Sequence, residues 1–183
     1  IVKEKVDEKD QVICADLFSL DEKQESFVRK IPYGHYMITG VPGSGKTQIL
    51  IARAIHLIKE NPNWNIQIVT YNLSLTNKIE SILNEIAMDY SKSPILKDVN
   101  MANISVSTFH KMAMRESRER LPSRLNSEEK NKWFNEILPQ IALQKCKPSY
   151  DAVMIDEYQD FKDDWIKVCI NLCKKYIDNL KLN

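Results

Sequence analysis

The chain has 183 residues, a formal net charge of +1 and a hydrophobic content of 43%, so it can build one domain with its own core and is not disordered in composition. Its near-balanced charge provides no overall basic field, although a local basic path for nucleic acid is compatible with it. No apolar run approaches the roughly 18 residues of a membrane span, and we find no secretory signal. We therefore expect no membrane partner.

The N-terminal residues are strongly charged, and we expect residues 1–16 to be a linker or extension ahead of one domain over residues 17–183. Because the first residue is Ile1 and not methionine, we expect the chain to be a piece of a longer polypeptide. Only two of the cysteines lie close together, and a zinc site needs more ligands, so we expect reduced thiols. The four are Cys14, Cys146, Cys169 and Cys173. No disulfide is suggested, which fits a cytoplasmic protein.

The expected domain begins with a helix and a short strand. Ser19 followed by Glu22 resembles a capping box and predicts a helix that runs to about Arg29. Residues 36–39 are predicted to form a strand that leads into a glycine-rich loop. Residues 47–59 are apolar almost all round, which predicts a helix buried against a sheet.

Strands and helices alternate through the rest of the chain. Further strands are predicted over residues 66–70, 104–108 and 152–155, the last short and apolar as a buried parallel strand is. Helices are predicted from Leu75 to Ile86, where apolar residues recur at three- and four-residue steps, and over 161–176. This alternation predicts an α/β fold, with a parallel sheet flanked by helices and joined by right-handed crossovers.

Two connections interrupt this pattern. Residues 91–103 are expected to form a loop. Residues 111–149 are expected to form a small, charged helical insertion that is broken near Pro122, Pro139 and Pro148.

Residues 40–47 read Gly-Val-Pro-Gly-Ser-Gly-Lys-Thr and match the phosphate-binding pattern G-x-x-x-x-G-K-[ST] between a predicted strand and a predicted helix. Glycines allow backbone N–H groups to converge on phosphate oxygens, and the helix N-terminus adds partial positive charge. Lys46 is expected to bridge the terminal phosphates and the Thr47 hydroxyl to hold Mg²⁺. The alternative is a glycine-rich turn formed by chance, with Lys46 in solvent.

A pair of acidic residues, Asp156 and Glu157, follows the predicted strand 152–155. Open α/β sheets bind ligands at the carboxyl ends of their strands, so a carboxylate there is expected to face the phosphate loop. Asp156 would hold the magnesium shell, and Glu157 would orient or deprotonate the attacking water. The alternative is a surface turn that happens to begin with two acidic residues.

These segments resemble the UvrD/Rep-like branch of superfamily I DNA helicases. The run Asp156-Glu157-Tyr158-Gln159-Asp160 resembles the D-E-x-Q-D form of motif II, and Leu20-Asp21-Glu22-Lys23-Gln24 resembles the Q motif. The match runs from about Leu17 to the chain end, with four motifs in the family's order. It implies a P-loop NTPase with a RecA-like sheet (domain 1A) that uses ATP and Mg²⁺.

The resemblance also implies which residues form the nucleotide site. Gln24 would read the adenine edge, although composition alone gives it no role beyond a solvent-facing glutamine. The expected catalytic residues are Lys46, Asp156, Glu157 and Gln159, and the expected metal ligands are Thr47 and Asp156. The expected cofactor-binding residues are Gln24, Gly40, Val41, Pro42, Gly43, Ser44, Gly45, Lys46, Thr47 and Gln48.

Two further segments resemble the motifs that line the single-strand path in this family: 69–72 resembles motif Ia and 107–110 motif Ib. The implied nucleic-acid residues are Thr70, Tyr71, Asn72, Thr108, Phe109 and His110. Tyr71 would stack on a base, a contact worth roughly 1–3 kcal/mol that tolerates any sequence. Thr108 and His110 would contact backbone or sugar. From the residues alone, Tyr71 and Phe109 fit core aromatics equally well, and His110 fits a polar cap.

The chain departs from the family pattern in three ways. The insertion 111–149 is short, which argues against strong duplex unwinding. The chain ends before motif III, and it holds no second RecA-like domain, whose arginines complete the site. Such arginines are worth ~10³–10⁵ in rate in other phosphoryl-transfer enzymes. We therefore expect a second RecA-like domain of the same polypeptide as a partner, and poor hydrolysis by this chain alone.

The expected function is that of a helicase domain that couples ATP hydrolysis to translocation on, or unwinding of, DNA. Single-stranded DNA is the expected partner, and RNA is an open alternative. Two other functions compete with this one. The first is a regulatory P-loop NTPase that acts on protein partners, and the second is a helicase-like module of a defence system.

Overall fold

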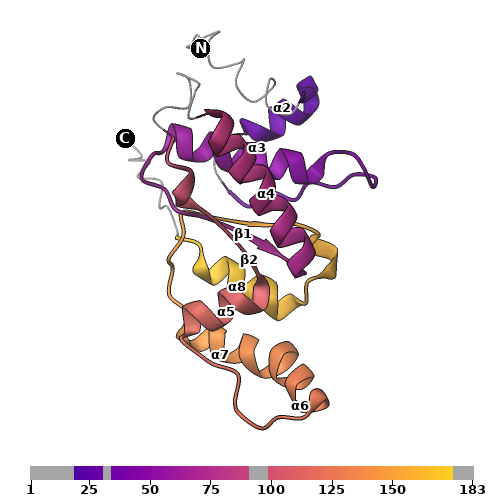
Figure 1. Cartoon of the computed structure of the whole chain (residues 1–183), viewed down its shortest axis with the longest axis vertical. Coiled ribbons are helices and arrows are strands. Elements are labelled where there is room, and N and C mark those ends of the chain that lie inside the picture. Colours follow the sequence, from indigo (N-terminus) through magenta and orange to yellow (C-terminus); the bar gives the residue numbers. More distant parts are fainter. Residues whose placement is uncertain (1–18, 31–33, 91–98, 175–183) are drawn as a thin grey trace, which may run out of the picture. The chain divides into compact units, whose positions relative to one another are not determined.

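The computed structural model describes residues 19–30, 34–90 and 99–174, which divide into two compact units. Among the described residues, unit 1 comprises 19–30, 34–63, 79–90 and 99–104, and unit 2 comprises 64–78 and 105–174. Helix α4 (Leu73–Tyr90) begins in unit 2 and ends in unit 1, and it confirms the helix predicted there. Figure 1 labels the α-helices of both units and strands β1 and β2.

The first helix of unit 1, α2 (Glu22–Val28), begins with a capping box. The Asp21 carboxylate accepts a hydrogen bond from Gln24 N at 2.8 Å, and Gln24 Oε1 accepts one from Asp21 N at 3.0 Å. The prediction that Ser19 and Glu22 form this box was wrong. Ser19 has a left-handed φ of 49°, whereas a capping residue needs the extended backbone that Asp21 has.

Helix α3 (Lys46–Glu60) packs against α2 in unit 1 and confirms the predicted apolar helix. A small core joins Leu20 and Val28 to two residues of α3, Ile49 and Ala52. The Arg53 guanidinium of α3 donates hydrogen bonds to two carbonyl oxygens at the end of α2, Val28 O at 2.5 Å and Lys30 O at 2.7 Å. A cation there satisfies carbonyl groups that the helix itself leaves unpaired.

The predicted strand over residues 36–39 was wrong, because within the described chain these residues have no strand conformation. Tyr36 and Met37 are 47% and 69% exposed. A short apolar run pairs into a sheet only where side-chain burial offsets the cost of ordering it, and these two side chains are not buried.

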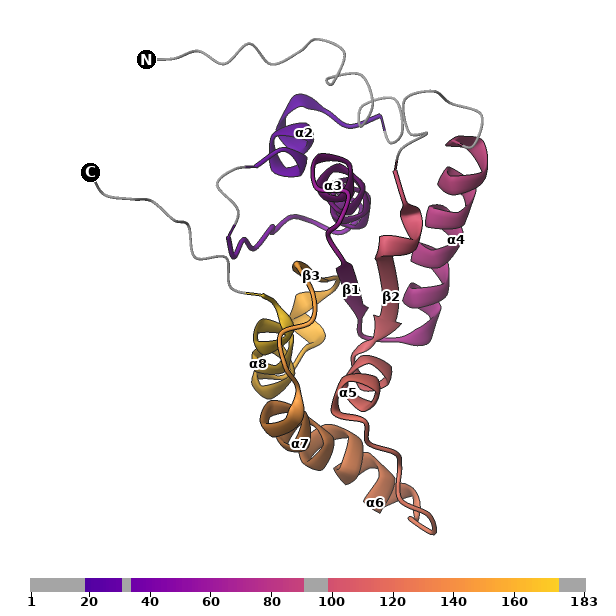
Figure 2. The same cartoon turned by 90° about the vertical axis from the view of Figure 1, so that its left-hand side faces the viewer.

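Unit 2 contains a three-stranded sheet of strand order β2-β1-β3, seen side by side in Figure 2. Its strands are β1 (Ile66–Thr70), β2 (Ile104–Thr108) and β3 (Ala152–Ile155), which confirm three of the four predicted strands. β1 and β3 are parallel, with Ile66 opposite Ala152 and Val69 opposite Ile155. All five residues of the central strand β1 are buried, so this α/β sheet has its core around β1.

The helices of unit 2 follow β2 and β3. After β2 come α5 (Phe109–Ser117), α6 (Ser127–Lys132), a π-helical turn (Trp133–Ile137) and α7 (Leu138–Lys145). After β3 come a 3₁₀ turn (Tyr158–Asp160) and α8 (Asp163–Leu172). Both views show α6 at the end of unit 2 farthest from the sheet.

Helices thus occupy much of the segment predicted to be an insertion, but Pro139 does not break them. It lies in the first turn of α7, directly after the π-helical turn. Proline is tolerated at the start of a helix because it has no N–H to lose and its φ is already helical. No helix of the described residues is long and apolar enough to cross a membrane. Residues 91–98 of the predicted loop, and Cys14, lie outside the described residues.

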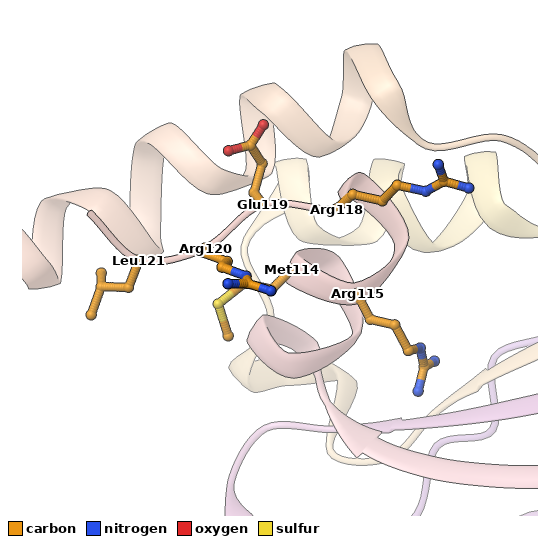
Figure 3. A pocket seen from close by; sticks show the side chains of 6 residues that line it. All are labelled: Met114, Arg115, Arg118, Glu119, Arg120 and Leu121. Atoms are coloured by element: carbon orange, nitrogen blue, oxygen red, sulfur yellow. The ribbon is translucent and has the colours of Figure 1, made fainter. Parts of the chain in front are cut away.

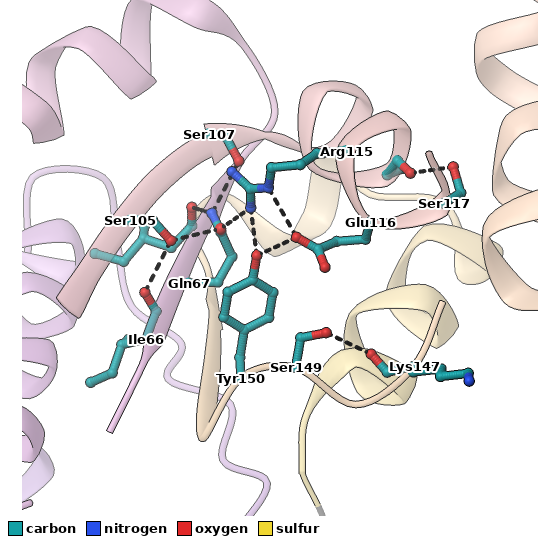
Figure 4. A network of polar contacts seen from close by, with 12 residues as sticks. Ile66, Gln67, Ser105, Ser107, Arg115, Glu116, Ser117, Lys147, Ser149 and Tyr150 are labelled. Atoms are coloured by element: carbon teal, nitrogen blue, oxygen red, sulfur yellow. Dashed lines mark hydrogen bonds and ion pairs between the residues drawn. The ribbon is translucent and has the colours of Figure 1, made fainter. Parts of the chain in front are cut away.

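A polar network links α5 to the sheet inside unit 2 (Figure 4). Gln67 of β1 is fully buried, and its amide donates to Ser107 Oγ at 3.0 Å and accepts from Arg115 at 2.7 Å. The Tyr150 hydroxyl accepts from Arg115 and donates to Glu116, both at 2.5 Å. Burial, together with the hydrogen bond to Glu116, raises the pKa of Tyr150 to about 12. The network therefore ties the base of the insertion to β1.

We expect Tyr150→Phe to destabilise unit 2 by about 1–3 kcal/mol, because Arg115 and Glu116 lose a shared partner in a partly buried site. The matched control is Tyr158→Phe, whose ring is 44% exposed and which should change stability by less than about 0.5 kcal/mol. Urea unfolding measures both. Equal stability of the two variants would contradict a structural role for the network.

Candidate functional site

The glycine loop 40–45 adopts a conformation that only glycine takes without strain at two of its positions. Gly43 and Gly45 have left-handed φ values of 79° and 78°. A Cβ atom on Gly40 would lie 2.7 Å from Ser44 Oγ, so the loop also closes tightly at its first residue. A hydrogen bond from Ser44 N to Val41 O at 3.2 Å completes the turn. The loop therefore has a closed conformation that depends on glycine at these positions.

Positive charge accumulates where the loop enters α3. Lys46 is the first residue of the helix, and its ammonium donates to Gly40 O at 3.1 Å and to Val41 O at 3.2 Å. The N-cap residue Gly45 has no side chain that could cap the helix, and the first turn holds no acidic residue. Helix N-termini carry partial positive charge and unpaired N–H groups. An uncapped N-terminus beside an ammonium fits an anionic ligand such as phosphate.

Gln24 lies against the glycine loop. Its amide Nε2 donates to Ser44 O at 3.1 Å while its Oε1 serves the capping box of α2. A Cβ atom on Gly45 would lie 3.1 Å from both Gln24 Nε2 and Gln48 Oε1. Gln24 and Gln48 thus both lie against the loop within unit 1. Val41 is exposed, and Thr47 is half-buried.

The acidic pair continues directly from β3 in unit 2. Asp156 is 4% exposed, and its backbone N–H donates to Val69 O at 3.0 Å, which extends the β1–β3 pairing by one residue. Glu157 has a left-handed φ of 53°, a conformation that costs a non-glycine residue about 1–3 kcal/mol. Gln159 Nε2 donates to Glu157 Oε2 at 2.5 Å. Glu157 therefore begins a strained turn directly after β3, and its carboxylate accepts a hydrogen bond from Gln159.

The turn after β1 presents Tyr71 to solvent. Thr70 is fully buried, and its hydroxyl lies 2.6 Å from Thr76 Oγ1 and 3.1 Å from Asn72 O. Asn72 Oδ1 accepts from Leu75 N at 2.9 Å and so caps the start of α4. Tyr71 stays 45% exposed between these anchored neighbours. The prediction that Thr70 contacts nucleic acid is corrected, because its side chain is enclosed by the turn that it stabilises.

The segment after β2 is more buried than predicted. The Thr108 side chain caps α5 by accepting from Lys111 N. Phe109 is fully buried, and its ring stacks on Trp165 with centroids 4.6 Å apart and planes at 5°. The prediction of direct nucleic-acid contact by Phe109 is therefore corrected to a core role. His110 is half-buried, with its ring edge against Phe134 and Trp165.

Trp165 of α8 is the residue that sequence reasoning missed. It contacts the rings of four site or neighbouring residues: Tyr71, Phe109, His110 and Phe161. Trp165 Nε1 and His110 Nε2 are both buried without a hydrogen-bond partner, which costs about 1–3 kcal/mol for each group. The only signal in the sequence is the four-residue spacing from Phe161, which places two aromatic side chains on one side of a turn or helix.

The side chains of the described residues do not form a metal site without a further ligand. The described residues hold no group of three or more His, Cys, Asp and Glu side chains in metal-binding range. Magnesium typically uses one or two carboxylates together with phosphate oxygens and water. Thr47, in unit 1, and Asp156, in unit 2, are the metal ligands predicted from the sequence, and each has an oxygen atom of the kind that magnesium binds.

Unit 2 also has a shallow basic hollow of about 480 Å³ at the end of α5 (Figure 3). Its lining residues are Met114, Arg115, Arg118, Glu119, Arg120 and Leu121. None of the predicted site residues lines it. The hollow therefore supplies no evidence for the nucleotide or nucleic-acid residues.

Comparison with known proteins identifies a family. A family model described as the UvrD/REP helicase N-terminal domain matches residues 20–140. The matched segment includes the glycine loop, the turn after β1 and the start of α5, and it ends within α7, ahead of Asp156. Neither the curated proteins nor the solved structures gave a significant match.

We expect Gly45→Ala to destabilise the chain more than Gly43→Ala. Both residues have nearly the same left-handed φ, so both variants bear about 1–2 kcal/mol of backbone strain. Only at Gly45 does the added methyl group crowd Gln24 and Gln48, since nothing lies within 4 Å of a Cβ atom on Gly43. Loss of the Gln24–Ser44 hydrogen bond should add about 1 kcal/mol. Equal unfolding free energies of the two variants would contradict this packing.

Acidification should destabilise the fold through His110. Burial, together with the positive charge of Lys162, lowers its pKa, although a hydrogen bond with the Phe134 backbone opposes the shift. Because unfolding restores a pKa near 6.5, the contribution of His110 is present above that pH and is lost as the pH falls through the lower folded pKa. Urea unfolding at about pH 7.5 and about pH 5.5 should show a smaller pH dependence for His110→Phe than for wild type.

The control for this measurement is His35→Gln, since His35 is exposed. This variant should keep the pH dependence of the wild type. If His110→Phe also kept the wild-type pH dependence of the unfolding free energy, the imidazole of His110 would not be the source of that dependence.

Proposed function

Because the chain belongs to the UvrD/REP helicase family, whose N-terminal-domain model matches residues 20–140, we propose that it binds Mg-ATP and couples ATP hydrolysis to movement along single-stranded DNA. The match supports a helicase ATP-binding domain in general. The residue roles, the nucleic acid and the coupling are the proposal.

One observation carries the nucleotide part of this proposal. The glycine loop closes on Lys46 at the start of a 15-residue helix that has no side-chain cap and no acid in its first turn. This geometry concentrates N–H donors and positive charge, which an anion would satisfy. We assign the phosphates of ATP to the loop from Gly40 to Gly45 and to Lys46. Gln24, already against the loop, is assigned to the adenine edge.

The acidic segment is assigned to the hydrolytic step. The Thr47 hydroxyl and the Asp156 carboxylate would bind Mg²⁺, which offsets phosphate charge in the transition state. Glu157 would accept the proton of the attacking water. The hydrogen bond from Gln159 supports this role, since it holds the Glu157 carboxylate in one orientation while leaving its second oxygen to the water.

Single-stranded DNA is assigned to the exposed turn after β1. Tyr71 offers a half-exposed ring whose neighbours anchor the turn on both sides. A ring held in this way can stack on any base. Asn72, Thr108 and His110 are assigned to the sugar–phosphate chain at the same end of the strands. The bases of RNA also present aromatic faces for stacking, so the choice of DNA rests on the family.

A second RecA-like domain of the same polypeptide is the proposed partner. It would supply the cations that stabilise the transition state, whereas nucleotide binding would use the residues assigned above. The two properties are therefore separable by experiment.

Calorimetric titration with Mg-ATPγS tests the nucleotide site. We expect Lys46→Ala to weaken binding by roughly 10- to 100-fold, the loss of a charge-assisted contact. Gln24→Ala should weaken it less, and Lys59→Ala, in the last turn of the same helix, should leave it unchanged. Binding that Lys46→Ala does not affect would contradict the proposed loop. Nucleotide binding without binding to a single-stranded oligodeoxynucleotide would favour an NTPase that acts on protein.

A further inference from the structure

Four aromatic contacts converge on Trp165, and they come from three separate segments of unit 2. Tyr71 lies in the turn after β1, Phe109 and His110 open α5, and Phe161 directly follows the acidic segment. The Trp165 ring stacks on Phe109 and, at a centroid distance of 6.2 Å and an angle of 27°, on Tyr71. Trp165 therefore contacts both segments assigned to DNA and the segment that carries Glu157.

Resting on the function proposed above, we propose that Trp165 is a positioning residue that holds Tyr71 ready to stack on a DNA base and links that ring to the acidic segment.

The contact with Trp165 restricts the side chain of Tyr71. An exposed tyrosine loses side-chain freedom when it stacks on a base, and this loss reduces the affinity. Trp165 is 2% exposed and is itself fixed by its parallel stack on Phe109. Its ring therefore provides a rigid surface that restricts Tyr71 before DNA arrives, so less freedom remains to be lost on binding.

The indole is poorly explained as a core filler alone. Its Nε1–H is buried without a partner, and a phenylalanine or leucine would fill space with no such group. What the indole provides is ring area, which meets four other rings at once. This supports a role for the faces and edges of the ring as a platform.

The link to the acidic segment runs through Phe161. Phe161 N donates to Tyr158 O at 3.0 Å and so closes the 3₁₀ turn that Glu157 begins. The Phe161 ring meets Trp165 edge-on, with centroids 5.7 Å apart. A change in the turn that carries Glu157 is thus passed to Trp165 across one ring contact, and from Trp165 to Tyr71 across a second.

The test compares binding of the chain to a single-stranded oligothymidylate and to an abasic oligonucleotide of the same length. The ratio of the two dissociation constants isolates stacking, because both ligands carry the same phosphates. We expect a ratio of roughly 5 to 150 for wild type and a ratio near one for Tyr71→Ala. Trp165→Leu should lower the ratio most of the way to that of Tyr71→Ala, and adding Tyr71→Ala to it should have little further effect. Trp165→Phe, which keeps a ring, should restore much of the ratio.

Trp133→Leu is the matched control. Trp133 is also buried, at 4% exposure, but its ring contact is with Phe134. This variant should lower the melting temperature to a similar extent and keep the wild-type ratio. A folded Trp165→Leu chain with the wild-type ratio, alongside a low ratio for Tyr71→Ala, would overturn the role of Trp165 alone. A wild-type ratio near one would overturn the proposed stacking by Tyr71 and this inference together.

A second measurement leaves Trp165 in place. In a chain with Trp64→Phe and Trp133→Phe, Trp165 is the sole tryptophan. Its emission should change on saturation with oligothymidylate and not with the abasic oligonucleotide. Unchanged emission on saturation with both ligands would overturn the contact between the DNA-binding ring and Trp165.

Discussion

The hydrogen bond from Asp156 N to Val69 O continues the parallel pairing of β1 with β3 by one residue. This pairing determines which segments lie next to each other at the ends of the strands. Parallel strands end at the same edge of a sheet, so the turn that carries Tyr71 and the segment that carries Glu157 leave the sheet at neighbouring positions. A one-residue slip in this register would turn the strand faces over. The complete burial of β1 opposes such a slip.

The same aromatic residues serve as core and as support for the site. The rings of Phe109, Phe161 and Trp165 pack the interior beneath α5 and α8, yet each belongs to or touches a segment with an assigned function. Two buried polar atoms without partners, in His110 and Trp165, show that this interior is not optimised for stability alone. Together with the left-handed Glu157, they concentrate strain where the chemistry is proposed.

Local patterns in the sequence were sufficient for some features and not for others. The glycine loop, helix α3 and three strands follow from spacing and apolar character, which are properties of adjacent residues. The predicted strand at 36–39 failed because pairing depends on what lies beside a segment. Burial of Thr70 and Phe109, and the contact of Trp165 with Tyr71, depend on packing between segments far apart in the chain, which no local window contains.

The hydrogen bonds of Lys46 within the glycine loop influence which anions the loop can bind. Its ammonium is already bonded to the carbonyl oxygens of Gly40 and Val41, so an incoming ligand competes with the loop for the same donors. A single monovalent anion forms few hydrogen bonds in place of those between Lys46 and the loop that it disrupts. A run of linked phosphates can engage the ammonium and the helix N–H groups together, so occupancy should rise steeply with the length of the phosphate chain. Under the proposed function, the hydrogen-bonded lysine would therefore favour a triphosphate over a monovalent anion.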